Sequence, residues 1–163
     1  MRFSPVAGFA LMLAVLPACQ PALNWREVRP AGSGALALFP CKPDVEQRAG
    51  MGLARCETGA KGFALSWADT PDASQSGAAL KAMAQALAAK LGQPLPPAEA
   101  LQVPGMTPLP EAGQYRLVGT GSATRLAVFA HGGRVYQAVM TAPQDDPAAW
   151  DSFATGLRVE PAR

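Results

Sequence analysis

Hydrophobic and polar positions alternate with a period of two along much of the chain, which predicts β-strands. The alternation is clearest in 62–69 (GFALSWAD), where Phe63, Leu65 and Trp67 fall on one face. The apolar run 34–40 (GALALFP), which ends at a proline, predicts a buried strand. A turn at 42–44 leads into a polar strand, and further short strands are expected over 25–29, 51–58 and 114–121.

The strongest local prediction is a β-hairpin near the end of the chain. Residues 124–131 (TRLAVFAH) and 134–141 (RVYQAVMT) flank Gly132-Gly133, a pair that suits a two-residue turn. His131 adjoins this turn and is the only histidine of the chain. Because turns lie on the surface, we expect this imidazole to be exposed.

Two other ranges change to the helical period. Range 76–92 predicts a helix with Ser76 as N-cap and Gly92 just beyond its end, and its apolar stripe consists of Leu80, Met83, Ala84, Leu87 and Leu91. Range 144–160 predicts a second helix that is capped by Asp146 and begins at Pro147, with a stripe of Trp150, Phe153, Ala154 and Leu157. Between the hydrophobic blocks, 93–113 holds six prolines and is expected to be an irregular surface loop.

The N-terminus has the layout of an export signal. Arg2 precedes an uncharged apolar run over 6–16. As a helix this run would rise about 16 Å, whereas a bilayer core is about 30 Å thick, so it is too short to span a membrane. We therefore interpret 1–18 as a signal peptide.

The residues around the expected cleavage point resemble the lipobox of bacterial lipoproteins. Leu16-Pro17-Ala18-Cys19 offers a branched aliphatic residue at −3, a small residue at −1 and cysteine at +1. The proline at −2 departs from the usual alanine, serine or threonine. The resemblance implies that the Cys19 thiol receives a diacylglycerol and becomes the new N-terminus, which places the protein in the cell envelope. Gln20 at +2 is not the aspartate of inner-membrane retention, so the periplasmic face of the outer membrane is favoured over the inner membrane. An ordinary signal peptide with an incidental cysteine is the alternative.

Composition narrows the classes of partner. Removal of 1–18 from the 163 residues leaves 145, enough for one domain with its own core. The 14 Lys and Arg of the whole chain face 12 Asp and Glu, and no block of like charge occurs. This balance argues against nucleic acid, which requires a basic patch, and against electrostatic binding to an anionic membrane.

The other two cysteines of the chain are Cys41 and Cys56. If Cys19 carries a lipid, these two cysteines remain, and in an oxidising compartment such a pair indicates one disulfide. Free thiols, a redox-active pair and a metal site are the alternatives, although no C-x-x-C motif is present and a metal would lack further ligands.

Candidate catalytic chemistry is sparse. No serine lies in a G-x-S-x-G setting, the two adjacent aspartates Asp145 and Asp146 are explained by helix capping, and the glycine-rich stretches lack the spacing of a phosphate loop. We therefore expect no enzyme, no catalytic residue, no cofactor and no metal.

Three blocks resemble small exported bacterial proteins of unknown function that are similar to the PsbP-like family. They are GALALFPCKPD, GFALSWAD with the helix after it, and GGRVYQAVMTAPQDDPAAWDSFATGLRV. Arg134 and Tyr136 match the R-x-Y of the closing block, where we expect cross-strand packing, and Cys41 replaces a usual glycine. The resemblance implies an α+β fold, a central antiparallel sheet with about two helices packed on it in an α/β/α sandwich.

The expected organisation is a lipoprotein signal peptide over 1–18, a tether over 19–33 and a single α/β domain over 34–160. The leading hypothesis is a non-catalytic lipoprotein, held at the membrane by a lipid on Cys19, that serves as an accessory or protein-interaction domain of the envelope. A small-ligand binder with its site between the sheet and the 93–113 loop is the first alternative. A thiol redox protein that uses Cys41 and Cys56 is the second.

Overall fold

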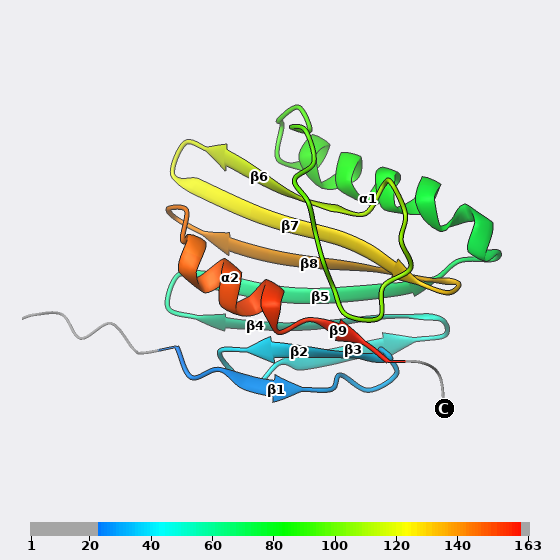
Figure 1. Cartoon of the computed structure of the whole chain (residues 1–163). Coiled ribbons are helices and arrows are strands. Elements are labelled where there is room, and N and C mark those ends of the chain that lie inside the picture. The colour runs from blue at the N-terminus through cyan, green and yellow to red at the C-terminus, as the bar shows by residue number, and fades with distance from the viewer. Residues whose placement is uncertain (1–22, 161–163) are drawn as a thin grey trace, which may run out of the picture.

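The structure, a computed structural model, describes residues 23–160 and consists of two antiparallel sheets and two helices (Figure 1). The six-stranded sheet has the order β3-β4-β5-β8-β7-β6. Its strands are β3 (Asp44–Arg48), β4 (Met51–Thr58), β5 (Lys61–Asp69), β6 (Gly113–Gly119), β7 (Ser122–His131) and β8 (Arg134–Ala142). The Gly132-Gly133 turn joins β7 to β8 as expected, with His131 opposite Arg134.

A small second sheet, which the sequence pattern does not predict, packs against the first. It consists of β1 (Arg26–Val28), β2 (Ala35–Phe39) and β9 (Arg158–Val159) in the order β1-β2-β9. Trp25, just before β1, lies edge-on to Phe63 of the large sheet, and Ser33 is fully buried. Residues 25–33, which fall in the expected tether, therefore pack against the two sheets.

Helix α1 (Ser76–Lys90) forms where the apolar period predicts it, but its start differs from the expectation. Asp72 caps a preceding short 3-10 helix, η1 (Ala73–Gln75), and Ser76 is inside α1 as a buried residue, not its N-cap. The hydroxyl of Ser76 instead donates to the Gly132 carbonyl at 3.3 Å, which ties the helix to the β7–β8 turn. Gly92 takes a positive φ of 66°, as expected for the residue after a helix end.

Helix α2 (Pro147–Thr155) begins as predicted. The Asp146 carboxylate accepts a hydrogen bond from the Ala149 amide, and Pro147 occupies the first turn, where its missing N–H is not needed. Gly156 ends the helix against Leu38 of β2, since a Cβ at this position would come within 2.4 Å of the leucine side chain. This close approach brings α2 onto the small sheet.

The two faces of the large sheet carry separate hydrophobic clusters. On one face, Phe63, Phe129 and Tyr136 pack with α2 and the small sheet. On the other, Leu126 and Val128 pack with Leu80 and Ala84 of α1. The result is three layers, with α1 on one side of the six-stranded sheet and α2 with the small sheet on the other, which confirms the α+β fold class.

The proline-rich segment 93–112 is more than the surface loop that its composition predicts. It crosses in front of the sheet down to β9 and returns to β6 (Figure 1). Leu101 and Val103 are buried in the α2-side cluster, and Leu109 packs against the α1-side cluster. Hydrogen bonds from the Thr107 amide to the Ala130 carbonyl (2.7 Å) and from the Val159 amide to the Pro104 carbonyl (3.0 Å) fix its path. Prolines prevent a regular ladder here, but they leave the apolar side chains free to complete the core.

Among residues 23–160, no helix is long and apolar enough to cross a membrane.

Candidate functional site

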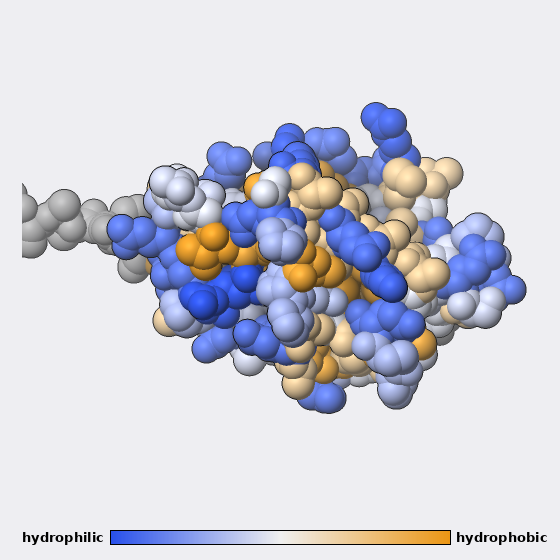
Figure 2. All heavy atoms as spheres, turned by 90° about the horizontal axis from the view of Figure 1, so that it is seen from above, coloured by the Kyte–Doolittle hydropathy of each residue, from blue (hydrophilic) through white to orange (hydrophobic). Residues whose placement is uncertain are grey.

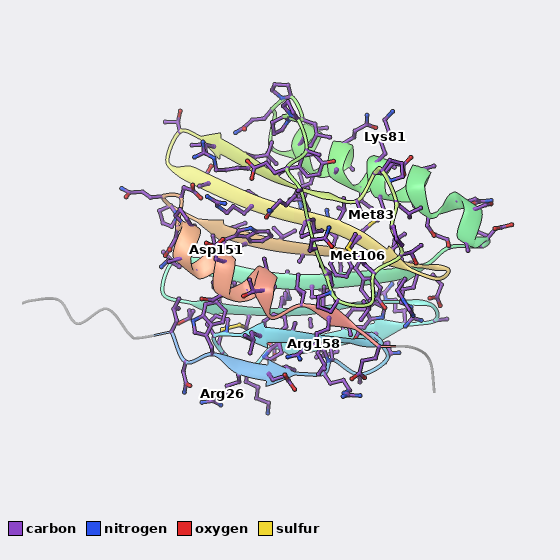
Figure 3. All side chains as sticks on the ribbon, viewed as in Figure 1. Arg26, Lys81, Met83, Met106, Asp151 and Arg158 are labelled. Atoms are coloured by element: carbon purple, nitrogen blue, oxygen red, sulfur yellow. A yellow bond between two sulfur atoms is a disulfide. The ribbon has the colours of Figure 1, made fainter. Side chains whose placement is uncertain are left out.

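The best candidate for a binding surface is a shallow groove on the α1 side of the sheet, which we call the strand groove. Helix α1 covers β7 and β8 but leaves β3, β4 and β5 open on this side. The groove has a volume of about 330 Å³, and its lining consists of Glu46, Arg48, Met51, Gly52, Leu53, Ser66, Trp67, Ala68 and Met83. Met83 lies on the side of α1 that faces the sheet, whereas Lys81 points away from it (Figure 3).

The strand groove is lined largely by apolar side chains that are at least partly exposed. Met51 is 53% exposed, Leu53 is half-buried and Met83 closes one side as a partly buried side chain. Methionine is flexible and polarisable, so it adapts to varied apolar partners. Glu46 and Arg48 stand at the rim with opposite charges. The groove is therefore suited to an apolar side chain or short apolar segment framed by polar groups.

Behind the strand groove, on the α2 side of the sheet, a glycine makes room for a core tryptophan. Gly52 lies opposite Trp67 in the β4–β5 ladder, and a Cβ at Gly52 would come within 2.1 Å of the indole Cζ2. The indole thus crosses β4 directly over Gly52 and is only 2% exposed. Any larger residue at this position would displace the ring from the core.

The groove borders a free sheet edge. Strand β3 pairs with β4 on one side only, and all five of its residues are exposed. Three of them, Asp44, Glu46 and Arg48, are charged, which is a common protection of an edge against unwanted strand pairing. The surface seen from above mixes hydrophilic and hydrophobic residues, with apolar residues running across its middle (Figure 2).

A second hollow, the end hollow, lies at one end of the molecule and has a volume of about 1080 Å³. It is lined by Leu23, the β4–β5 turn over 58–61 and the β8–α2 connection over 143–148. The described chain thus begins in this hollow. Neither hollow lies between the sheet and the 93–113 loop, where the small-ligand alternative places a site.

Charged side chains near the end hollow are engaged with one another. Asp145 accepts two hydrogen bonds from Arg125, at 2.6 and 2.8 Å, and one from Arg116 at 3.2 Å. The pairing with Arg125 holds the pKa of the Asp145 carboxyl below its ordinary value. The Lys61 ammonium lowers the pKa of Asp146 in the same way, with a further contribution from the Ala149 amide. Capping therefore explains Asp146 but not Asp145, whose role is an ion pair that joins β7 to the α2 connection.

Arg134 and Tyr136 of the R-x-Y motif hold a loop. The Arg134 guanidinium pairs with Asp69 at 2.6 Å and donates to the carbonyls of Gly32 (2.6 Å) and Ser33 (3.2 Å). The Tyr136 hydroxyl donates to the Ser33 carbonyl at 2.8 Å. Burial raises the pKa of Tyr136, so the phenol stays protonated and keeps this donor. The motif thus fastens the β1–β2 loop to the large sheet, in addition to cross-strand packing, which Tyr136 makes by stacking on Phe129.

Cys41 and Cys56 form a disulfide, as predicted, with 5.9 Å between their Cα atoms. Cys41 follows β2 of the small sheet, and Cys56 is a buried residue of β4 in the large sheet. The bond therefore connects the two sheets covalently.

His131 at the hairpin turn has a structural partner. Its Nδ1 lies 2.7 Å from the Gly105 carbonyl of the proline-rich segment. Within the described part of the chain, no three His, Cys, Asp or Glu side chains gather as a metal site would require. Cys19, the predicted lipidation site, falls outside the described residues.

Sequence reasoning missed the strand groove and the Arg125–Asp145 pair. The groove arises because α1 covers only part of the sheet, and the pair joins residues that are 20 positions apart. The local pattern of the predicted strand 51–58 carries no signal that its first residue, Met51, lies on an open face.

No protein-family model matches this chain, and no curated protein matches its sequence. Among solved structures, it is similar to a protein from Bacteroides thetaiotaomicron VPI-5482, with a TM-score of 0.47 and 12% sequence identity. The match covers 80% of this chain and 47% of that one, so the chain spans about half the length of the Bacteroides structure. The resemblance to the PsbP-like family stays a prediction.

Proposed function

We propose that this protein is a non-catalytic lipoprotein of the bacterial cell envelope, anchored through a lipid on Cys19, whose domain binds a protein partner in the strand groove. The single observation that carries the binding role is the exposed apolar groove beside the free edge of β3. The anchor rests on the lipobox at 16–19 and the apolar run before it.

The use of the charged residues supports a binding role over catalysis. Asp69 and Asp145 are each engaged by an arginine that lowers the carboxyl pKa, and Asp146 caps α2. A general acid at neutral pH needs a raised carboxyl pKa, which is the opposite shift. The Cys41–Cys56 disulfide joins the two sheets, and Cys56 is buried. A buried cysteine is poorly accessible to thiol exchange, so the bond fits a structural cross-link better than the redox alternative.

The test of the groove uses two equally exposed positions. Met51 in the groove and Val118 on β6, at the opposite edge of the sheet, are both 53% exposed. A photoreactive amino acid is placed at one position or the other in the full chain, and crosslinking is carried out in intact cells. The proposal expects a discrete crosslinked protein from position 51 and none from position 118.

Competition then separates specific binding from chance proximity. Added wild-type domain should suppress the crosslink from position 51, and a Met51→Glu domain should not, because a carboxylate in the groove would be desolvated by the partner. Equal crosslinking from both positions, or equal competition by the two domains, would refute the groove as the binding site.

A further inference from the structure

The place where the described chain begins restricts how a lipidated molecule can lie on a membrane. This inference rests on the proposed lipidation of Cys19. Leu23 lines the end hollow and packs against the core, and Trp25 lies against Phe63. Three residues lie between Cys19 and Leu23, so their Cα atoms are four steps apart, and even a fully extended chain spans at most about 14 Å between them.

Much of the expected fifteen-residue tether over 19–33 is therefore not free to extend between the lipid and the domain. Residues 25–33, which would have extended it, are bound into the fold by β1, by the burial of Ser33 and by the hydrogen bonds of Arg134 and Tyr136. A chain that is fixed from Leu23 onward keeps the end hollow close to the lipid on Cys19. A long flexible tether would leave the orientation of the domain open, but one this short does not.

The length of β4 sets the distance between the end hollow and the strand groove. The β4–β5 turn, with Ala60, lines the end hollow, and the β3–β4 turn, with Ala49, lies at the opposite end of β4. Strand β4 has eight residues, which span about 27 Å. Met51 of the strand groove comes directly after the far turn.

Among the residues that the structure describes, neither end of β4 carries a cluster of unpaired cations that would draw it to an anionic membrane. The cations at the end hollow are paired, Lys61 with Asp146 and Arg125 with Asp145. The free edge at β3 carries charges of both signs. An anionic membrane attracts clusters of several Lys and Arg, so neither surface would hold the domain against lipid without the anchor.

We infer that the acylated protein rests with its end hollow against the phospholipid headgroups and presents the far end of β4, with the strand groove, away from the bilayer. The partner of the end hollow is thus the headgroup layer, and the groove is open to a partner that approaches from the aqueous side.

The experiment compares two labels on the acylated full chain in vesicles that contain a headgroup-linked quencher. A fluorophore is attached to Ala60→Cys or to Ala49→Cys, two exposed alanines in hairpin turns at opposite ends of β4. Cys41 and Cys56 stay oxidised and Cys19 is acylated, so the new thiol alone reacts. The label at residue 60 is expected to lose most of its fluorescence, whereas the label at residue 49 keeps most of its own.

A variant with twelve Gly and Ser residues inserted after Gln20 serves as the matched control. The longer tether should reduce the difference between the two labels, because a flexible linker of this length adds about 20 Å of root-mean-square reach. Equal quenching at both turns with the native tether, stronger quenching at residue 49, or an unchanged difference after the insertion would overturn the inference while leaving the lipid anchor intact.

Unacylated Cys19→Ser protein distinguishes the anchor from the orientation. It should not bind anionic vesicles at low salt. If it binds them with the same asymmetry of quenching, the domain surface and not the tether sets the orientation, and the inference falls. If the wild-type chain carries no lipid and does not bind, the proposed function fails, and the inference fails with it.

Discussion

The Cys41–Cys56 bond offers the most quantitative test of how the two sheets are held together. The cysteines are 15 positions apart. A cross-link that closes a loop of this size lowers the entropy of the unfolded chain by an amount worth about 3 kcal/mol at 25 °C. Reduction of the bond should therefore lower the free energy of unfolding by about 3 kcal/mol.

Two perturbations separate the cross-link from packing. Reduction of the wild-type protein breaks the bond but leaves both sulfur atoms in the core. The double variant Cys41→Ala/Cys56→Ala also removes the sulfur atoms, and Cys56 is 7% exposed, so this variant should lose up to about 1 kcal/mol more. The difference between the two measures the packing contribution alone.

Urea unfolding at 25 °C, followed by circular dichroism with and without reductant, is the assay. With a slope of about 2 kcal/mol/M, the midpoint of the reduced protein should fall by about 1.5 M. In thermal unfolding, an entropy of about 2.1 cal/mol/K per residue over roughly 140 residues converts 3 kcal/mol into a fall of about 10 °C. The double variant should not respond to reductant. A reduced wild-type protein with an unchanged urea midpoint would refute the reasoning.

Three further predictions concern single side chains. Gly52→Ala should destabilise the fold by about 1–3 kcal/mol, because the new Cβ displaces the Trp67 indole; a wild-type near-UV circular dichroism spectrum and urea midpoint would contradict this. Asp145→Asn should cost about 2 kcal/mol at pH 7 through the lost charge-assisted hydrogen bonds to Arg125. The pKa of Asp145 is lowered in the folded state, so this stabilisation is present above the ordinary carboxyl pKa and lost as pH falls through the folded value. The gap between the urea midpoints of wild type and Asp145→Asn should accordingly narrow as the pH falls below about 5, and a gap that stays constant into strong acid would disprove the assignment. Tyr136→Phe should cost about 1 kcal/mol and speed amide hydrogen exchange in the β1–β2 loop, with unchanged exchange there as the opposing result.

Elements with a sustained local pattern could be predicted from the sequence. The β7–β8 hairpin follows from two alternating runs around Gly132-Gly133, and α2 follows from Asp146-Pro147 before an apolar stripe. Both signals are contained within a few neighbouring residues, so no tertiary information is needed to interpret them.

The missed features depend on contacts between distant parts of the chain. Strand β9 has two residues, too few to show any period, and it exists because β2 lies beside it. Ser76 resembles an N-cap by residue type, but its hydroxyl is bound to the distant Gly132 carbonyl. The burial of Leu101 is likewise set by the sheet beneath it, while the prolines around it predict only irregular backbone.

The same distinction applies to the candidate site. The disulfide could be predicted because the expected lipid on Cys19 leaves one pair of cysteines, and the structure contains the bond between them. The strand groove could not, because it is the part of the sheet that α1 leaves uncovered, and the sequence does not state where on the sheet a helix lies.

Metabolic labelling with a fatty-acid analogue tests the lipid anchor at Cys19 most directly. The wild-type chain and the Cys41→Ala/Cys56→Ala variant should both incorporate the label, because neither of those cysteines is the acceptor. Cys19→Ser should lose it and should leave the membrane fraction. Label that persists in Cys19→Ser, or a wild-type chain that takes up none, would contradict the account.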